Sequence, residues 1–325
     1  MALSISVIIL NWNGKQDTLS CLQSLEDCRE ISFDTIVVDN GSTDGSQEAI
    51  KKRFPQIKLI ENNENLGFAE GNNVGIREAL TLGADLIFLL NNDTVVSPTL
   101  LNAFLEEFQR HPEAGILGAK IYLFEEKNRL DHLGGMWNRR TATFDYIGHR
   151  QLDEPLPPQE IDYVCGAGMM IRRQVFDTIG LLEPRYFLIW EESDFCFRAK
   201  RAGWTTRTCP QAKLWHKVSA SFVGGKPHST YFWWRNRLLW IERNCSTGEK
   251  WSIYLRVILP DVFHMLKIYL LKRGQLSIQT LFQSQKSLQE KKQKLLKTRA
   301  ALCGVRDYLF RRFGNGPRWI YTLRG

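Results

Sequence analysis

The chain has 325 residues, of which 43% are hydrophobic, so it is long enough for one large α/β domain with additions or for two domains. Its seven cysteines contain no C-x-x-C pair, and the N-terminus lacks a basic segment followed by a long apolar stretch, which argues against a disulfide framework and a secretory signal. A reduced cytoplasmic compartment fits these features best.

The net charge of +8 is unevenly distributed along the chain. Residues 264–325 contain 14 Lys or Arg against 2 Asp or Glu, whereas residues 1–263 contain 29 against 33. An acidic body with a basic C-terminal arm indicates a polyanionic partner for the arm, either a lipid surface or a nucleic acid. A nucleic acid is disfavoured, because the arm lacks aromatic residues interleaved among its lysines.

The most hydrophobic part of this tail is residues 251–273. It is interrupted by Arg256, Pro260, Asp261, His264 and Lys267, which are too many polar or helix-breaking residues for a membrane span of about 20 apolar residues. The segment can lie on a membrane, but we do not expect it to cross one.

Short apolar runs alternate with helix-like patterns over the first 110 residues. Strands are predicted at residues 5–10, 35–39, 57–60 and 86–90, and helices at residues 17–25, 44–54, 72–82 and 98–110. Apolar runs of this kind are typical of a parallel sheet that is buried on both faces. The repeated β-α-β pattern predicts a Rossmann-like sheet whose ligand binds at the carboxyl ends of the strands.

The pattern loosens between residues 111 and about 165, where residues 132–141 and the Pro-rich 153–160 are predicted as loops. A further buried strand is predicted within 163–173, followed by a short helix at 175–180 and a helix at 191–203 that ends at Gly203. Beyond Thr230 the chain is predicted to be almost wholly helical, with an extended helix at 283–313. Residues 217–230, rich in Ser and Gly, are interpreted as a lid over the ligand.

Polar residues follow two of the predicted strands. Asn91, Asn92 and Asp93 follow strand 86–90, and the first and last of these can both offer oxygens to a hard cation that also holds a diphosphate. A polar turn before the next helix is the alternative. Asp39 ends strand 35–39, where an acceptor for a base N–H or a ribose hydroxyl would lie. Helix capping accounts for residues 42–44 but not for Asp39.

A third polar cluster occupies residues 65–76. It combines three glycines with three asparagines, namely Gly67, Gly71, Gly75, Asn65, Asn72 and Asn73. This combination suits close backbone approach and amide hydrogen bonding to a ligand, although a glycine-rich loop at a helix start explains it as well. A nicotinamide dehydrogenase would require G-x-G-x-x-G after the first strand, and residues 11–17 contain a single glycine.

Taken together, the motifs point to one family. In chain order they are SVIILNWNG, VVDNGSTDGS, NLGFAEGNNVGI, LLNNDT, CGAGMMIRR, WEESDFCFRAKRAGW and LWHKVSAS. This set resembles glycosyltransferase family 2, an inverting group with the GT-A fold, over about residues 3–245. Within it, LDHLGGMW and YFWWRNRLLW look most like bacterial rhamnosyltransferase-type members that build surface polysaccharides.

The resemblance implies an α/β fold of the GT-A type, with a Rossmann-like, mostly parallel central sheet flanked by helices. We therefore expect a glycosyltransferase domain at residues 1–245, divided into a nucleotide-binding half at 1–93 and an acceptor and catalytic half at 94–245. A mainly helical, basic C-terminal extension is expected at residues 246–325.

The resemblance also assigns residues to the nucleotide-sugar donor and to a divalent cation, Mg²⁺ or Mn²⁺. Those expected to bind the donor are Leu10, Asn11, Trp12, Asn13, Asp39, Asn65, Gly67, Phe68, Asn72, Asn91 and Asn92. Asp93 matches the last acid of the D-x-D motif, which reaches the cation that bridges the donor diphosphate, whereas Asn91 replaces the first acid and removes a charge. His216 matches a histidine that completes the metal site in some members; a surface or core histidine is the alternative.

The acidic cluster at 191–194 is the expected catalytic centre. Inverting transfer is a single displacement that needs a base on the acceptor hydroxyl and charge neutralisation on the departing diphosphate. The family's base, the second acid of an E-D-x-D-like motif, corresponds to Glu192, which is one methylene longer than Asp. Helical spacing predicts an ion pair between Asp194 and Arg198, with Glu191 in the supporting first turn. An acidic first turn that complements the helix dipole is the alternative.

The resemblance therefore implies a metal-dependent inverting hexosyltransferase of cell-surface polysaccharide synthesis. We expect dTDP-rhamnose as the donor, a glycan or polyprenyl-diphosphate-linked glycan as the acceptor, and a peripheral location on the inner face of the cytoplasmic membrane, held by the basic arm on anionic lipid. The alternatives are a transferase for another nucleotide sugar, or a nucleotide-sugar-binding protein without transferase activity, which the altered acids at Asn91 and Glu192 would favour.

Overall fold

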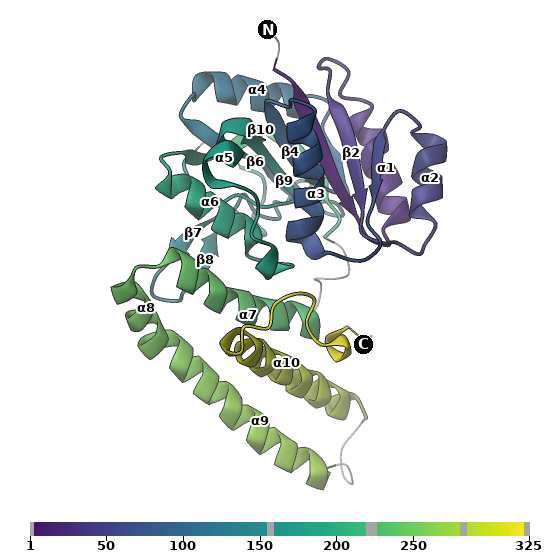
Figure 1. The fold of residues 1–325 in the computed structure, drawn as a ribbon. Helices are drawn as coiled ribbons and strands as arrows, with labels where there is room; N and C mark the ends of the chain where they lie inside the picture. Colours follow the sequence, from purple (N-terminus) through teal and green to yellow (C-terminus); the bar gives the residue numbers. More distant parts are fainter. Residues whose placement is uncertain (1–2, 155–158, 219–225, 280–284, 322–325) are drawn as a thin grey trace. The chain divides into compact units, whose positions relative to one another are not determined.

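The computed structural model describes residues 3–154, 159–218, 226–279 and 285–321, with the backbone alone at 272–279 and 285–288 (Figure 1). The chain divides into two compact units. We call the first the sheet unit, composed of Met1–Trp137, Phe144–Phe187 and Glu191–Ser219. The second, the helical unit, is composed of Asn138–Thr143, Leu188–Trp190 and Ala220–Gly325.

The central sheet of the sheet unit has the strand order β3-β2-β1-β4-β9-β6-β10-β5. Its strands are β1 (Ile5–Asn11), β2 (Asp34–Asp39), β3 (Lys58–Glu61), β4 (Leu86–Asn91), β5 (Thr94–Val96), β6 (Ala114–Leu123), β9 (Gly168–Arg172) and β10 (Thr205–His216). Neighbours pair in parallel from β3 to β4 and between β6 and β10, whereas β9 runs antiparallel to β4 and β6, and β5 antiparallel to β10. The parallel strands β1, β2 and β4 therefore end at one edge of the sheet.

Helices cover both faces of this sheet (Figure 1). They are α1 (Lys15–Leu25), α2 (Ser46–Arg53), α3 (Gly67–Thr81), α4 (Leu100–Arg110), α5 (Arg173–Ile179) and α6 (Glu191–Arg201), with a 3₁₀ turn, η1, at Pro184–Tyr186. Alternate residues of β1 point to opposite faces, because side chains alternate along a strand. Val7 and Ile9 pack in a core with α1, α2 and α4, and Ile8 packs in a second core with α3, α5 and α6.

Most of the predicted elements form close to the expected positions. The strands and helices predicted before residue 111 are present with boundaries shifted by a few residues, of which the largest is the start of α3 at Gly67 instead of Asn72. Helix α6 ends near Gly203, whose φ of +92° suits a glycine after a helix. The predicted sheet and the helix at the acidic cluster are therefore confirmed.

The loop predicted at residues 132–141 is wrong for part of that segment, and no strand was predicted over β6. Of the loop predicted at 153–160, residues 155–158 lie outside the described residues. Strand β6 is buried along its whole length, and β7 (Gly135–Asn138) pairs with β8 (Thr143–Tyr146). The apolar pattern of β6 is interrupted by Gly115, Gly118 and Lys120, which concealed the strand. Both glycines admit packed neighbours, Trp204 and Val164, while the buried Lys120 ammonium pairs with Asp153.

The helical unit contains the predicted C-terminal helices. They are α7 (Pro227–Asn244), α8 (Thr247–Ile253), the π-helical turn η2 (Tyr254–Ile258), α9 (Leu259–Gln279), α10 (Gln285–Leu309) and the 3₁₀ turn η3 (Arg318–Ile320). Helix α10 continues through Gly304. A Cβ at this position would clash with the carbonyl oxygen of Tyr231, so glycine lets α7 and α10 pack closely. Of the expected lid at 217–230, residues 219–225 lie outside the described residues. No helix in the described ranges has the length and apolar character needed to cross a membrane.

Candidate active site

Asp39, at the carboxyl end of β2, is fully buried and held by three hydrogen bonds. Its carboxylate accepts from Asn11 Nδ2 at 2.6 Å, from the backbone nitrogen of Ser42 at 2.8 Å and from Gln47 Nε2 at 2.7 Å. A carboxylate has about four lone-pair positions, so one position is left for an N–H or O–H of a ligand. The protein thus fixes the acceptor in place before any ligand arrives.

The ends of β1 and β4 are joined by side-chain hydrogen bonds. Asn11, fully buried, accepts at Oδ1 from Thr18 Oγ1 at 2.8 Å and from Asn92 Nδ2 at 3.3 Å. Asn92 Nδ2 also lies 3.0 Å from Thr18 Oγ1. Asn91, half-buried, is the last residue of β4, and its carbonyl accepts from Thr94 Oγ1 at 2.7 Å. The three asparagines therefore lie together at one strand edge.

The residues around the end of β1 differ in exposure. Leu10 is half-buried and packs against Gly71. A Cβ at position 71 would lie 2.6 Å from Cδ1 of Leu10. Trp12 is 50% exposed, whereas the neighbouring Asn13 adopts a φ of +52° and accepts at Oδ1 from the backbone nitrogen of Thr43 at 2.8 Å. The loop after β1 is thus fastened to the loop after β2, with the indole ring of Trp12 on the surface.

The start of α3 makes a close backbone contact. Gly67 has a φ of +82°, and a Cβ there would lie 2.5 Å from the carbonyl oxygen of Phe187. Asn65 Oδ1 accepts from the Gly67 nitrogen at 2.8 Å, and Asn72 Nδ2 donates to the carbonyl of Phe68 at 2.9 Å. These side-chain amides stabilise the helix start. Asn72, which we expected to line the nucleotide site, thus donates a hydrogen bond to the protein backbone.

His216, the last residue of β10, lies between two carboxylates. Its Nε2 is 3.1 Å from Asp93 Oδ1 and its Nδ1 is 3.2 Å from Asp131 Oδ2, and all three residues are largely buried. A neutral imidazole has one N–H, so it can donate to only one of the two. Burial lowers the pKa of His216, but the hydrogen bonds to Asp131 and Asp93 raise it more, to about 9. In the metal-free protein the ring therefore carries two protons at neutral pH.

A divalent cation fits between Asp93 and His216. Two atoms in adjacent octahedral positions, each about 2.1 Å from a metal, are about 3.0 Å apart, close to the 3.1 Å between Asp93 Oδ1 and His216 Nε2. Oxygen and imidazole nitrogen are suitable ligand atoms. Within the described ranges no three His, Cys, Asp or Glu side chains are grouped to hold a metal by themselves. Mg²⁺ commonly combines one or two protein ligands with water and substrate phosphates.

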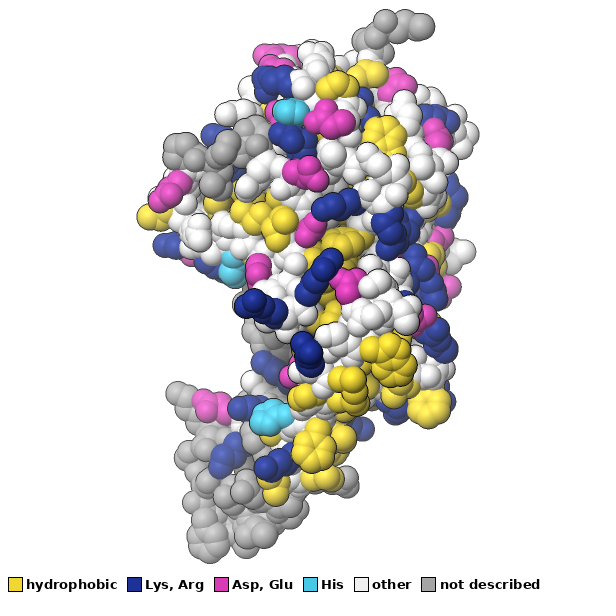
Figure 2. Space-filling model, turned by 90° about the vertical axis from the view of Figure 1, so that its left-hand side faces the viewer, with side chains coloured by type: hydrophobic (Ala, Val, Ile, Leu, Met, Phe, Trp, Pro, Cys, Tyr) yellow, Lys and Arg dark blue, Asp and Glu magenta, His cyan; other side chains and the backbone are white. Residues whose placement is uncertain are grey.

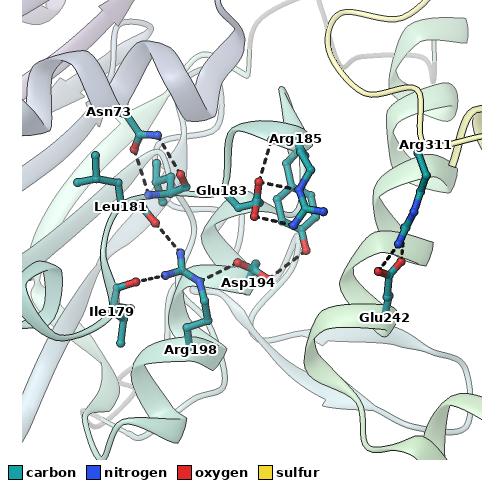
Figure 3. Close-up of polar contacts among 11 residues, drawn as sticks. Asn73, Ile179, Leu181, Glu183, Arg185, Asp194, Arg198, Glu242 and Arg311 are labelled. Atoms are coloured by element: carbon teal, nitrogen blue, oxygen red, sulfur yellow. Dashed lines mark hydrogen bonds and ion pairs between the residues drawn. The ribbon is translucent and has the colours of Figure 1, made fainter.

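The acids of α6 occupy different surroundings. Glu191 is 3% exposed, Glu192 is half-buried, and Asp194 is fully buried. Asp194 pairs with Arg198 at 2.9 Å, as predicted, and accepts from the hydroxyl of Tyr186 at 3.1 Å (Figure 3). Asp194 therefore anchors the helix, while Glu192, one of whose carboxylate oxygens is buried, lies in the same first turn.

The backbone before α6 is strained. Phe187, Ile189 and Trp190 have φ values of +63°, +72° and +82°. Such values cost bulky or β-branched residues about 1–3 kcal/mol each and persist only where surrounding structure holds them. Asn236 of α7 is fully buried and donates from Nδ2 to the carbonyls of Leu188 at 2.7 Å and Ile189 at 2.8 Å. The segment that leads into Glu191 is therefore held in one conformation.

The loop before β9 is the point where the separate parts of the site meet. A Cβ at Gly166 would lie 3.4 Å from the ring of Phe68 and 3.8 Å from Cβ of Glu192. Burial raises the pKa of the neighbouring Cys165 thiol, and nearby carboxylates, among them Glu192 and Asp93, raise it further. The backbone nitrogen of Asn91 donates to the carbonyl of Ala167 at 3.2 Å, so the structure brings α3, the end of β4 and α6 around residues 165–167.

Comparison with known proteins identifies the family. The model of Glycosyl transferase family 2 matches residues 6–180. The chain belongs to glycosyltransferase family 2. An N-acetylglucosaminyl-diphospho-decaprenol L-rhamnosyltransferase of Mycobacterium tuberculosis is 29% identical over 261 residues, which cover 68% of this chain and 83% of the relative. The dTDP-rhamnosyl transferase RfbF of Shigella flexneri is 22% identical over 252 residues, covering 74% and 81%.

The solved structures that resemble this family 2 chain show its fold. A mannosyltransferase from Pyrobaculum calidifontis in complex with GDP-Man and Mn²⁺ has a TM-score of 0.55 at 12% identity, covering 95% of this chain and 87% of that one. Residues 1–349 of TarS from S. aureus give a TM-score of 0.53 at 13% identity, covering 95% and 92%. The predicted GT-A fold is confirmed, and the protein is a glycosyltransferase most similar to rhamnosyltransferases.

Sequence reasoning missed two parts of this site. Asp131 follows β6 in a segment for which no element was predicted, and the resemblance assigned no role to it. Cys165 and Gly166 precede β9, and their position depends on the antiparallel insertion of β9 between β4 and β6. The motif LDHLGGMW, which contains Asp131, was the available signal, because it places an acid beside a histidine in an otherwise apolar stretch.

Proposed function

We propose that this glycosyltransferase moves a sugar, with inversion, from a nucleotide-sugar donor to a hydroxyl group of a glycan acceptor. The observation that carries the proposal is the meeting of two groups around residues 165–167. One is the Asp93–His216 pair just beyond β4, whose last residue donates a backbone hydrogen bond to Ala167, and the other is Glu192 at the start of α6. A cation site for the leaving diphosphate and a base for the acceptor are what a single displacement needs.

The donor would bind at the carboxyl ends of β1, β2 and β4. The residues we assign to it are Leu10, Asn11, Trp12, Asn13, Asp39, Asn65, Gly67, Phe68, Asn72, Asn91 and Asn92. The remaining lone-pair position of Asp39 suits a base N–H or a ribose hydroxyl, and the exposed Trp12 ring suits stacking on a base. Asn11, Asn65 and Asn72 act by holding the loops that surround the nucleotide.

Asp93 and His216 would hold the divalent cation, Mg²⁺ or Mn²⁺. When bound, the cation neutralises charge on the diphosphate as it departs. Asn91 offers a neutral oxygen where the D-x-D motif has its first acid, so Asp93 supplies the one protein carboxylate of the motif. The Mn²⁺ and GDP-Man in the mannosyltransferase with the same fold support this part of the proposal.

Glu192 would act as the base. It takes the proton of the acceptor hydroxyl while that oxygen forms a bond to the anomeric carbon. The bond from this carbon to the diphosphate oxygen breaks in the same step, and the diphosphate leaves with the electron pair. Asp194, tied to Arg198, and the buried Glu191 would position the first turn of α6, so they support Glu192 instead of exchanging protons themselves.

We propose dTDP-rhamnose as the donor and a polyprenyl-diphosphate-linked glycan as the acceptor. The activities named for the two relatives, a decaprenol-linked rhamnosyltransferase and a dTDP-rhamnosyl transferase, support both choices. Residues 1–93 would bind the nucleotide and residues 94–245 the acceptor. The basic extension at 246–325 would bring the enzyme to an anionic membrane that carries the acceptor.

A melting-temperature screen of nucleotide sugars with Mn²⁺ tests the donor. A ligand at 100 times its Kd raises the free energy of unfolding by about 2.7 kcal/mol. We expect dTDP-rhamnose to give the largest shift, and chelation of Mn²⁺ by EDTA to remove both the shift and the turnover. A larger shift with a UDP or GDP sugar would contradict the rhamnosyl assignment and identify the transferase as one for that sugar.

A further inference from the structure

A row of exposed apolar side chains runs along α8, η2 and α9 of the helical unit. Its members, each between 42% and 72% exposed, are Trp251, Leu255, Leu259, Phe263, Leu266 and Leu270. Successive members are three or four residues apart, and this spacing keeps side chains on one side of a helix. We call this row the α8–α9 face. Figure 2 shows hydrophobic side chains gathered on the helical unit, with Lys and Arg side chains beside them.

The α8–α9 face belongs to well-anchored helices. Ile253 and Ile258 are 3% and 5% exposed, so the opposite side of the same segment is packed into the helical unit. Helix α8 begins with a capping box in which the Ser246 hydroxyl and the Glu249 carboxylate satisfy each other's backbone nitrogen. The apolar row is therefore displayed by a fixed scaffold, and large apolar patches displayed in this way mark binding surfaces.

The acidic side chains in the segment that carries the α8–α9 face are paired with arginines. Between residues 246 and 271, all of which are described, the acidic side chains are Glu249 and Asp261. Each is held by an arginine of the helical unit, Glu249 by Arg139 at 2.8 Å and Asp261 by Arg237 at 3.5 Å.

Cations border the same face. Arg256 and Lys267, both exposed, directly follow two leucines of the row, and residues 264–325 contain 14 Lys or Arg against 2 Asp or Glu. The face thus combines an apolar centre with a cationic edge and a cationic tail.

We propose that the α8–α9 face lies in the interfacial layer of an anionic lipid bilayer. The helix axis runs parallel to the membrane, the apolar row contacts acyl chains, and Arg256 and Lys267 reach the lipid phosphates. An apolar protein partner would account for the row but not for the cationic edge and tail. The inference rests on the proposed function in one respect, since that function requires an acceptor carried by the same membrane.

Sedimentation of the full chain with lipid vesicles tests the proposal. We expect binding to vesicles of phosphatidylglycerol and phosphatidylcholine, weaker binding to phosphatidylcholine alone, and at least a tenfold loss for the double variant F263E/L270E. Leu82, 50% exposed at the end of α3, provides the control, because L82E adds one of these two negative charges to an exposed leucine elsewhere. L82E is expected to bind vesicles nearly as the wild type does, with the small loss that one added negative charge causes.

Several outcomes would overturn the membrane proposal. Wild-type binding by F263E/L270E would show that the face does not contact lipid. Concentration-dependent dimers that F263E/L270E abolishes would assign the face to a second copy of the chain. Failure of the wild type to bind any vesicle, together with retained transfer to a detergent-solubilised acceptor, would reject the membrane surface while leaving the proposed function intact.

Asp131 carries a second, independent inference, because it holds the nitrogen of His216 that faces away from Asp93. Its Oδ2 lies 3.2 Å from Nδ1 of His216, and Asp131 itself is 8% exposed. The backbone nitrogen of Asp131 donates to the carbonyl of Ile121 in β6 at 2.8 Å, which fixes the carboxylate in place. An acceptor at Nδ1 keeps the proton on that nitrogen, so the Nε2 lone pair is directed toward Asp93 and a cation beside it.

We infer that Asp131 is a positioning residue for the metal ligand His216. Partners of this kind typically change metal affinity by 10- to 100-fold. The inference rests on the proposed metal site. Its readout is the affinity of the protein for Mn²⁺ alone, measured by the paramagnetic resonance signal of free Mn²⁺ and independent of turnover.

We expect D131N to weaken Mn²⁺ binding about 10- to 100-fold and D131E to retain most of it. In the H216A background D131N should change nothing further, because a residue that acts through His216 has no effect once His216 is gone. D153N is the control, since Asp153 is a nearby carboxylate that pairs with Lys120. It should leave Mn²⁺ affinity unchanged.

The results separate the two claims. Wild-type Mn²⁺ affinity in H216A would reject the metal site of the proposed function itself. A loss in H216A without a loss in D131N would reject the role of Asp131 alone. A further loss on adding D131N to H216A would show that Asp131 acts by another route, which also contradicts the inference.

Discussion

The strand ends of the sheet unit bury polar side chains, whereas the α8–α9 face of the helical unit exposes apolar ones. At the strand ends Asn11 and Asp39 are fully buried, whereas on the α8–α9 face Phe263 is 72% exposed. Buried polar groups and exposed apolar patches are the deviations that carry information about ligands. Both regions indicate binding, but to different chemistry.

The two regions also differ in how complete they are without a ligand. The polar groups at the strand ends satisfy one another, as the three donors to Asp39 show. The apolar row gains stabilisation only when a partner removes it from water. The candidate active site is therefore preformed, whereas the α8–α9 face would be complete only in contact with the lipid surface that we propose for it. Single substitutions can separate the groups that maintain the preformed site from the group that reacts.

The largest effect is expected at Glu192. Glu192→Gln removes the base, and general-base catalysis is worth about 10²- to 10⁴-fold, so kcat should fall by that factor. The donor-induced melting shift should persist, because we assign the carboxylate to the acceptor and not to the nucleotide. Glu191→Gln, in the same helical turn, is expected to reduce kcat less. Unchanged transfer by Glu192→Gln would remove this residue from the mechanism.

The second largest effect is a difference in stability between breaking a buried ion pair and breaking an exposed one (Figure 3). Arg198 is 14% exposed and pairs with the fully buried Asp194, whereas Arg311 is 56% exposed and pairs with Glu242. Arg198→Ala leaves a buried charge without its cation and should lower the free energy of unfolding by about 3–5 kcal/mol. Arg311→Ala should cost at most about 1 kcal/mol. Urea unfolding measures both, and equal losses would contradict the assignment of Asp194 as the anchor of α6.

Two glycines with similar backbone angles offer a smaller, matched comparison. Gly67 and Gly83 have φ values of +82° and +84°, but a Cβ would lie 2.5 Å from the Phe187 carbonyl at Gly67 and would meet nothing within 4 Å at Gly83. Gly83→Ala should cost about 1–2 kcal/mol through backbone strain alone. Gly67→Ala should cost about 1–3 kcal/mol more and weaken nucleotide binding. If the two variants unfolded at the same urea concentration, the close contact of Gly67 with Phe187 would not contribute to stability.

The smallest effect is expected at Ser42. Its hydroxyl accepts from Asn11 Nδ2 at 3.1 Å and from the backbone nitrogen of Asn13 at 2.8 Å, and thereby joins the loops after β1 and β2. Ser42→Ala should lower the free energy of unfolding by about 1 kcal/mol. Nucleotide affinity, measured by calorimetry, should fall a few-fold. A change of more than 100-fold would mean that Ser42 contacts the nucleotide directly.

The sequence predicted those parts of the molecule that depend on local pattern. Apolar runs followed by Asp39 and Asn91 located the strand ends, and helical spacing located the Asp194–Arg198 pair. Strand β6 was not predicted because Gly115, Gly118 and Lys120 interrupt its apolar run. These residue types are explained by contacts with other segments, which the local pattern does not contain.

Contacts between distant segments account for the rest. Asp131 and His216 are 85 positions apart, and the strand pairing of β6 with β10 brings them together. No periodicity in either segment encodes this contact. The apolar row on α8 and α9 was visible as a hydrophobic segment, but its exposure depends on which side the helical unit buries.

The central claim is a single displacement with Glu192 as base and the Asp93–His216 pair at the leaving group. Proton NMR of the anomeric position during transfer by the wild type with Mn²⁺ tests it most directly. Our account predicts that the product has the anomeric configuration opposite to that of the donor, and that EDTA stops its formation. A product with retained configuration would contradict the account.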